Sequence, residues 1–148
     1  MNKKIKIYSL QILVCLFSLS AFANQETDKK KFLVIINSSN SIKSLDRQFL
    51  SDIYFKRVSH WVNDGTITPV DLKPDSPVRR EFSEAILSRS VSGIRNYWQQ
   101  LIFSGRDVPP PELSDDNEVI QFVRNNRGAI GYVSRLPENN GVKIIDIK

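Results

Sequence analysis

The sequence predicts an α/β fold in which a mixed or largely parallel sheet is flanked by helices. Residues 32–37 and 129–133 are short apolar runs, rich in branched residues, and both have the length of a buried strand. Amphipathic segments at helical spacing lie between them, and a further strand follows. The predicted order of elements is therefore β-α-β-α-α-α-β-β, which is typical of a sheet with helices on its faces.

The N-terminus has the three parts of an export signal. A basic start with three lysines precedes an apolar segment at residues 7–19, and Ala21-Phe22-Ala23 is a small-x-small cleavage site. We expect residues 1–23 to be a cleaved signal peptide, with an uncleaved anchor as the alternative. Residues 24–31 are polar and are expected to be a disordered lead-in. Residues 32–148 are expected to form a single domain in the periplasm.

The composition after the leader excludes several classes of protein. The only cysteine of the sequence lies in the leader, so residues 24–148 contain no thiol. Three of the 21 basic residues also lie there, which leaves 18 against 16 acidic residues. Because no basic stripe with interleaved aromatic residues follows, nucleic acid is not expected as a partner.

The first half of the domain begins with the strand at 32–37, and a helix follows in which Leu45, Phe49, Ile53 and Tyr54 recur at helical spacing. Ser44 or Asp46 is expected to cap that helix. A turn at 63–65 leads to a second strand at 67–72, where Pro69 indicates an edge position. Ser76 and Pro77 are a helix cap and a first helical residue, so the next helix is expected to begin there.

The second half contains two more helices before the last strands. Ser92 is expected to cap a helix with an apolar stripe, and Asp115 with Glu118 resembles a capping box. Gly128 is expected to be the left-handed residue that ends the last helix. Gly131 stands inside the strand at 129–133, which indicates a close approach to the backbone. A final strand is expected at 142–147.

The start of the helix at Pro77 is the best candidate for an anion site. A helix N-terminus presents unpaired N–H groups and a partial positive charge. Ser76 offers a hydroxyl there, and Arg79 and Arg80 lie in the first turn, where a guanidinium can grip an oxyanion with two bonds. Asp75 could accept a proton from a protonated phosphate or repel a dianion. The alternative is an ordinary helix start with solvated arginines.

Two further polar clusters are expected on the same rim. Ser38 and Ser39 follow the first strand, and the C-terminal ends of parallel strands share one edge of a sheet. The turn at 104–106 adds a cation. By contrast, catalysis has little support, because His60 is the only histidine and lies in a connector. No residues are spaced as metal ligands, and no cofactor is expected.

Several segments taken together resemble the periplasmic phosphate-binding proteins of ABC importers. They occur in the same order along most of the chain: residues 32–37, FLSDIYFK at 49–56, Trp61, residues 67–70, Asp75-Ser76, Phe82 and GAIGYV at 128–133. The resemblance implies a type 2 periplasmic-binding-protein fold. Because 125 residues are enough for one lobe only, the chain is similar to the short, single-lobe members of that superfamily.

The resemblance also implies where the chain departs from the family. The anion loop of the family has an arginine, then three other residues, then Ser-Gly-Thr. Here Ser76 matches the serine, but Pro77 and Val78 replace the glycine and threonine, and Leu72 replaces the arginine. Pro77 has no N–H to offer an anion.

Two functions are therefore expected. The first is a solute-binding module for phosphate or a similar small oxyanion, linked to ABC-type phosphate uptake. The second is an envelope interaction module that keeps the fold without the ligand. Its partner could be a membrane transporter, a sensor, another envelope protein or a second copy bound through the open face of the lobe.

Overall fold

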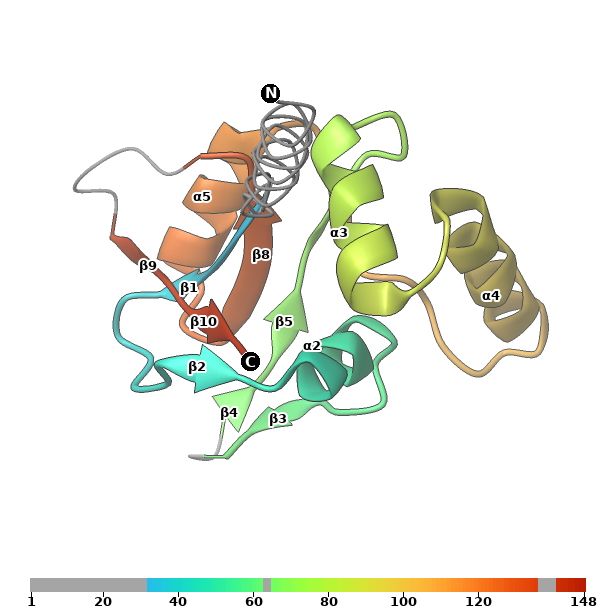
Figure 1. Ribbon diagram of the computed structural model, residues 1–148. Helices are drawn as coiled ribbons and strands as arrows, with labels where there is room; N and C mark the ends of the chain where they lie inside the picture. The colour runs from blue at the N-terminus through green and yellow to red at the C-terminus, as the bar shows by residue number, and fades with distance from the viewer. Residues whose placement is uncertain (1–31, 63–64, 136–140) are drawn as a thin grey trace, which may run out of the picture.

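The computed structural model describes residues 32–62, 65–135 and 141–148, and the expected signal peptide and lead-in lie outside them. Figure 1 shows the arrangement of the elements. The strands are β1 (Leu33–Asn37), β2 (Ser44–Leu45), β3 (His60–Trp61), β4 (Gly65–Thr66), β5 (Thr68–Pro69), β6 (Asp71–Leu72), β7 (Glu112–Leu113), β8 (Ala129–Val133), β9 (Val142–Ile144) and β10 (Asp146–Ile147). The helices are α2 (Arg47–Tyr54), α3 (Pro77–Leu87), α4 (Val91–Phe103) and α5 (Asp116–Asn125).

The main sheet has four strands in the order β5-β8-β1-β9. β5 is parallel to β8, whereas β1 is antiparallel to both of its neighbours. The predicted mixed sheet is confirmed, and the largely parallel alternative is wrong. A strand is buried on both faces because helices cover both faces of the sheet. This burial does not indicate whether the neighbouring strands run parallel or antiparallel.

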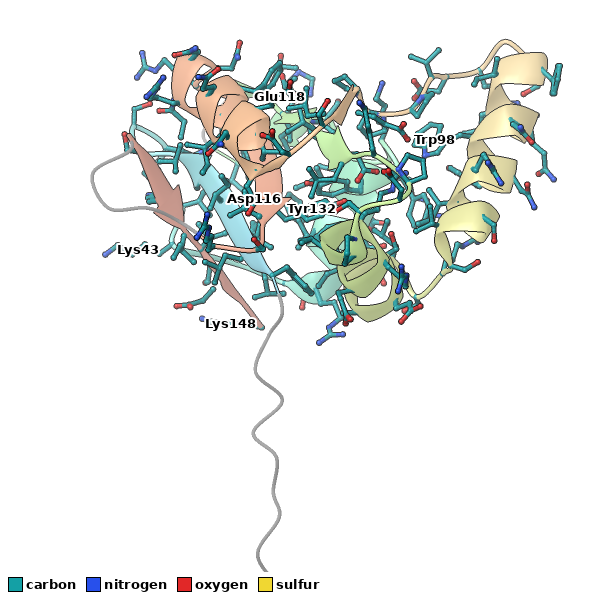
Figure 2. All side chains as sticks on the ribbon, turned by 90° about the horizontal axis from the view of Figure 1, so that it is seen from above. Lys43, Trp98, Asp116, Glu118, Tyr132 and Lys148 are labelled. Carbon is teal, nitrogen blue, oxygen red and sulfur yellow. The ribbon has the colours of Figure 1, made fainter. Side chains whose placement is uncertain are left out.

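The hydrophobic core lies on both faces of this sheet. α5 packs on β8 and β1, and α3 lies on the other side with α2 (Figure 1). All five residues of β8 are buried, and Ile35 and Ile36 of β1 are fully buried. α4 lies farthest from the sheet, beyond α3, and Figure 2 shows Trp98 pointing from α4 toward the rest of the molecule.

The helix starts follow the expected capping chemistry at three of four positions. Asp46 accepts from the N–H groups of Gln48 and Phe49, Ser76 caps α3, and Asp115 accepts from the N–H of Glu118. α4 begins two residues earlier than expected. Its cap is Ser90, whose hydroxyl accepts from the N–H of Gly93 at 3.1 Å, so Ser92 lies inside the helix.

The expected strand at 67–72 is divided into β5 and β6 by Val70, and β5 lies at the edge of the sheet, as Pro69 predicts. The strand expected at 142–147 is likewise divided, into β9 and β10. The turn predicted at 63–65 lies partly outside the described residues. Among the described residues, no helix has both the length and the apolar character needed to cross a bilayer.

The two glycines around β8 are required for different reasons. At Gly131, a Cβ atom would lie 2.6 Å from a methyl group of Val119 on α5, so the expected close approach is confirmed. Gly128 does not have a left-handed backbone. The expectation of a glycine helix cap is wrong, because α5 ends at Asn125 and the residue that caps it, Asn126, has an extended backbone. A Cβ on Gly128 would instead lie 2.0 Å from the carbonyl oxygen of Thr66.

We predict that Gly128→Ala destabilises the protein by about 1–3 kcal/mol, because a backbone carbonyl would have to move. Gly128→Asn should destabilise it at least as much, whereas a left-handed cap would tolerate asparagine. Gly65→Ala is the matched control, since its Cβ would meet Trp61 at an ordinary 3.9 Å. Urea unfolding of the three variants measures the differences, and a neutral Gly128→Asn would contradict the close approach.

Candidate functional site

A cavity of about 500 Å³ lies where the N-termini of α3 and α5 meet. It is next to the C-terminal ends of β6 and β8, which is where an α/β sheet commonly binds its ligand. Leu72 and Ile120 are among its apolar residues. Its polar lining comprises Asp75, Ser76, Ser114, Asp115, Asp116, Asn117, Ser134 and Arg135. We call it the helix-end cavity.

Both helices begin with their own side-chain caps. The Ser76 hydroxyl accepts from the N–H of Arg79 at 3.4 Å, and Asp115 accepts from the N–H of Glu118 at 3.0 Å. Glu118 in turn accepts from the N–H of Ser114 at 2.7 Å. Some of the backbone N–H groups at each helix end are therefore already bonded to side chains of the protein itself.

Asp116, the first residue of α5, occupies part of the rim. Its carboxylate accepts from the N–H of Ser134 at 3.0 Å, from the N–H of Arg135 at 3.4 Å and from the Ser134 hydroxyl at 2.5 Å. These bonds join the start of α5 to the chain that leaves β8. They also place an anionic group where backbone N–H groups converge.

The charges of the helix-end cavity do not match a simple anion site. Three carboxylates line it, from Asp75, Asp115 and Asp116, against the single guanidinium of Arg135. The two helix ends contribute roughly half a positive charge each. A polar cavity therefore does lie at the start of α3, where the sequence predicts an anion site. Its lining, however, is net acidic and not electropositive.

Arg79 lies inside the protein and not on the rim of the cavity. Its side chain is 5% exposed, with Nη2 3.0 Å from an Asp71 carboxylate oxygen and Nη1 2.8 Å from one of Glu112. Nη1 also donates to the carbonyl of Leu72. Its Nε is buried without a hydrogen-bond partner among the described residues. The guanidinium thus joins β6, α3 and β7, which leaves little of it for an external oxyanion.

Two tyrosines complete this buried network. The Tyr132 hydroxyl donates to Asp71, and the Tyr54 hydroxyl donates to the carbonyl of Val70 at 3.0 Å. Burial raises the pKa of Asp71 above the usual range of a carboxyl group, while the Arg79 guanidinium and the Tyr132 hydroxyl oppose that rise. Burial, together with the charge of Asp71, also raises the pKa of both tyrosines.

Ser38 and Ser39 lie at the other end of the sheet. Because β1 is antiparallel to β8, the C-terminal end of β1 lies beside the start of β8, away from Ser134. Ser39 donates to Asn37 at 2.7 Å and accepts from the Nε of Arg127 at 3.3 Å. It lines a second cleft, of about 510 Å³, with Trp61, Thr66 and Gly128 among its neighbours.

The expected convergence of the polar clusters on one rim is therefore not found. Arg80 and Ser38 are exposed, and neither lines the helix-end cavity. The turn at 104–106 follows α4, the helix farthest from the sheet (Figure 1). Of the five residues expected to bind an anion, the structure places only Ser76 in this cavity and Ser39 in the second cleft.

Sequence reasoning missed several residues of the two clefts. Ser134 and Arg135 directly follow the predicted strand at 129–133, and residues after a strand are the usual lining of such a cavity. Arg127 precedes the same strand, on the side that meets the loop after β1. The polar residues on both flanks of that strand were the available signal.

Comparison with solved structures shows where this fold recurs. The chain is similar to an ABC-type phosphate transport receptor of Vibrio cholerae, with 20% identity and a TM-score of 0.60 over 79% of this chain. A Clostridium perfringens protein with bound phosphate has 20% identity and a TM-score of 0.63 over 79% of this chain. PstS of Borrelia burgdorferi has 12% identity and a TM-score of 0.61 over 80%.

This chain matches a little less than half of the length of each of these three proteins. The match covers 46%, 44% and 47% of those three chains. The predicted likeness to a single lobe of the type 2 periplasmic-binding-protein fold is confirmed at the level of fold. The sequence matches no protein-family model and no curated protein.

We predict that Arg79→Ala lowers the free energy of unfolding by about 3–5 kcal/mol, because it leaves Asp71 buried without its counter-charge. Arg80→Ala, which removes an equal charge from the neighbouring exposed position, should change it by less than about 0.5 kcal/mol. Thermal and urea unfolding measure both. If Arg79→Ala were as mild as Arg80→Ala, the buried ion pair would not exist as described.

Proposed function

We propose that the protein is an exported, one-lobe module of the solute-binding type that binds phosphate or a similar small oxyanion weakly. Its place would be the periplasm, in connection with ABC-type phosphate uptake and a membrane transporter. The leader features of residues 1–23 support export. The fold shared with a phosphate transport receptor supports the functional class. The proposal assigns the protein no catalytic step and no cofactor.

The observation that carries this proposal is the meeting of two helix N-termini in one polar cavity beside strand ends. Helix N-termini favour anions, because N–H groups and the helix dipole point at the ligand. The hydroxyls of Ser76 and Ser114 and the guanidinium of Arg135 add donors around the same space. A single open lobe excludes less water than a closed cleft, so each of these bonds is worth less.

The carboxylates decide which oxyanion is favoured. Asp75 repels a fully deprotonated dianion, but it can accept a hydrogen bond from an anion that still carries a proton. Phosphate carries a proton near neutral pH, whereas sulfate does not. We therefore expect phosphate to bind in preference to sulfate, with weak affinity because three carboxylates face one guanidinium.

We predict that calorimetry at neutral pH detects binding of phosphate in the millimolar range and no binding of sulfate. Ser76→Ala should weaken phosphate binding about three- to tenfold, through loss of one hydrogen bond to a charged group. Asp75→Asn should remove the repulsion, so that sulfate binds as well as phosphate. Glu84→Gln, an exposed change on the outer part of α3, is the matched control and should leave both titrations unchanged.

The absence of any phosphate heat, together with no thermal shift at high phosphate, would contradict the ligand proposal. Equal binding of sulfate and phosphate by the unchanged protein would contradict the role of Asp75.

The acidic lining favours a second candidate function, an envelope interaction module that keeps the fold without the ligand. Asp116 is already held by three donors, so the carboxylate of the protein itself occupies a place that an anion would take. An open lobe face could then bind another envelope protein, a sensor or a second copy. This candidate predicts association in light scattering combined with a null phosphate titration, and a strict monomer that binds phosphate would contradict it.

A further inference from the structure

A separate cleft of about 420 Å³ lies between α2 and the turn that joins α3 to α4. Its rim carries Arg47 at the start of α2, Arg57 after α2, and Arg89 after α3. Phe55 and Leu87 are among the apolar residues below them. We call it the arginine cleft. None of its residues lines the helix-end cavity or the cleft at Ser39.

The charges of the arginine cleft are unbalanced. Three guanidiniums face a single carboxylate of the lining, that of Asp46. Asp46 is committed as the cap of α2, with bonds of 2.7 Å from the N–H of Gln48 and 3.3 Å from that of Phe49. Asp52 lies 3.1 Å from Arg57, but the Arg57 side chain is 52% exposed, so that pair is screened and weak.

Arg89 has no carboxylate partner among the described residues. Its guanidinium instead lies over two aromatic rings, 5.5 Å from the centre of Phe55 and 5.6 Å from that of Tyr97. Arg57 lies over the same Phe55 ring at 5.1 Å. Two positive charges thus share one ring. A stacked guanidinium keeps the N–H groups of its edge available for a carboxylate.

The third arginine is held across the cleft. Arg47 Nη1 donates to the carbonyl of Ala85 on α3 at 2.5 Å, which ties the start of α2 to the far wall. On that wall the chain leaves α3 at Ser88, whose backbone is left-handed with φ 52° and ψ 35°. The three guanidiniums therefore come from three different segments, above apolar side chains that are nearly buried, with Phe55 6% and Leu87 5% exposed.

We infer that the arginine cleft docks an acidic peptide segment of a partner protein. Cations on three separate segments suit several carboxylates spaced along a chain better than one compact anion. Arginine and aromatic side chains together are the typical anchors of protein interfaces. Nucleic acid fits less well, because residues 24–148 are nearly neutral, with 18 basic and 16 acidic residues.

Fluorescence anisotropy of the purified protein with a labelled synthetic peptide of glutamates and interspersed leucines tests this inference. The unchanged protein should bind this peptide and not its glutamine counterpart. Arg89→Ala should weaken binding about tenfold, through loss of a charge-assisted bidentate contact. Arg89→Lys should weaken it too, because lysine keeps the charge and loses the planar fork.

Arg106→Ala is the matched control, because it removes the same charge from an exposed position outside the cleft. Equal losses in Arg106→Ala and Arg89→Ala would overturn the inference by showing long-range attraction alone. Displacement of the peptide by low-millimolar inorganic phosphate would overturn it in favour of a small-anion site. A dimer that dissociates in Arg89→Ala would overturn it in favour of a second copy. Because Arg89 is outside the helix-end cavity, phosphate calorimetry on this variant separates this test from the proposed function.

Discussion

The ion pair between Arg79 and Asp71 is the constraint on which the rest of the structure depends. Two side chains with 5% and 7% exposure hold opposite charges 3.0 Å apart inside the domain. Burying such charges is costly unless the geometry is good and further hydrogen bonds satisfy them. Here Tyr132, Glu112 and the carbonyl of Leu72 supply those bonds. The network fixes the start of α3 against β6, β7 and β8, and therefore fixes one wall of the helix-end cavity.

The local features of this fold could be read from the sequence because they depend on neighbouring residues. Ser76 with Pro77, Asp46, and the buried strand around Gly131 each follow from backbone hydrogen bonding or from close packing. The role of Arg79 could not be read in this way. Its position in the first turn of α3 is compatible with a solvent-facing cation, and one of its carboxylate partners, Glu112, is 33 residues distant. Only the tertiary structure shows which way the side chain turns.

The sequence predicted where a polar cavity would lie, but it did not predict the charge of the residues that line it. The cavity at the start of α3 is where the sequence placed it, yet Asp115 and Asp116 reach it from α5, about forty residues further along the chain. The expectation that Ser38 and Ser39 lie on the same rim fails for one reason, the direction of β1. An apolar run specifies that a strand is buried, but it does not say whether its neighbours run parallel or antiparallel. With β1 reversed, the hydroxyls after it lie at the opposite end of β8.

The pairing of β1 also has a consequence for how the chain folds. β1 is the first strand of the described domain, and both of its partners, β8 and β9, lie beyond residue 128. Its backbone hydrogen bonds can form only when the ends of the domain come together. Contacts at such long sequence separation require loop closure before they contribute any stability, which slows folding. A partly synthesised chain therefore cannot complete its sheet, and the domain acquires its native structure only after its last strands are available.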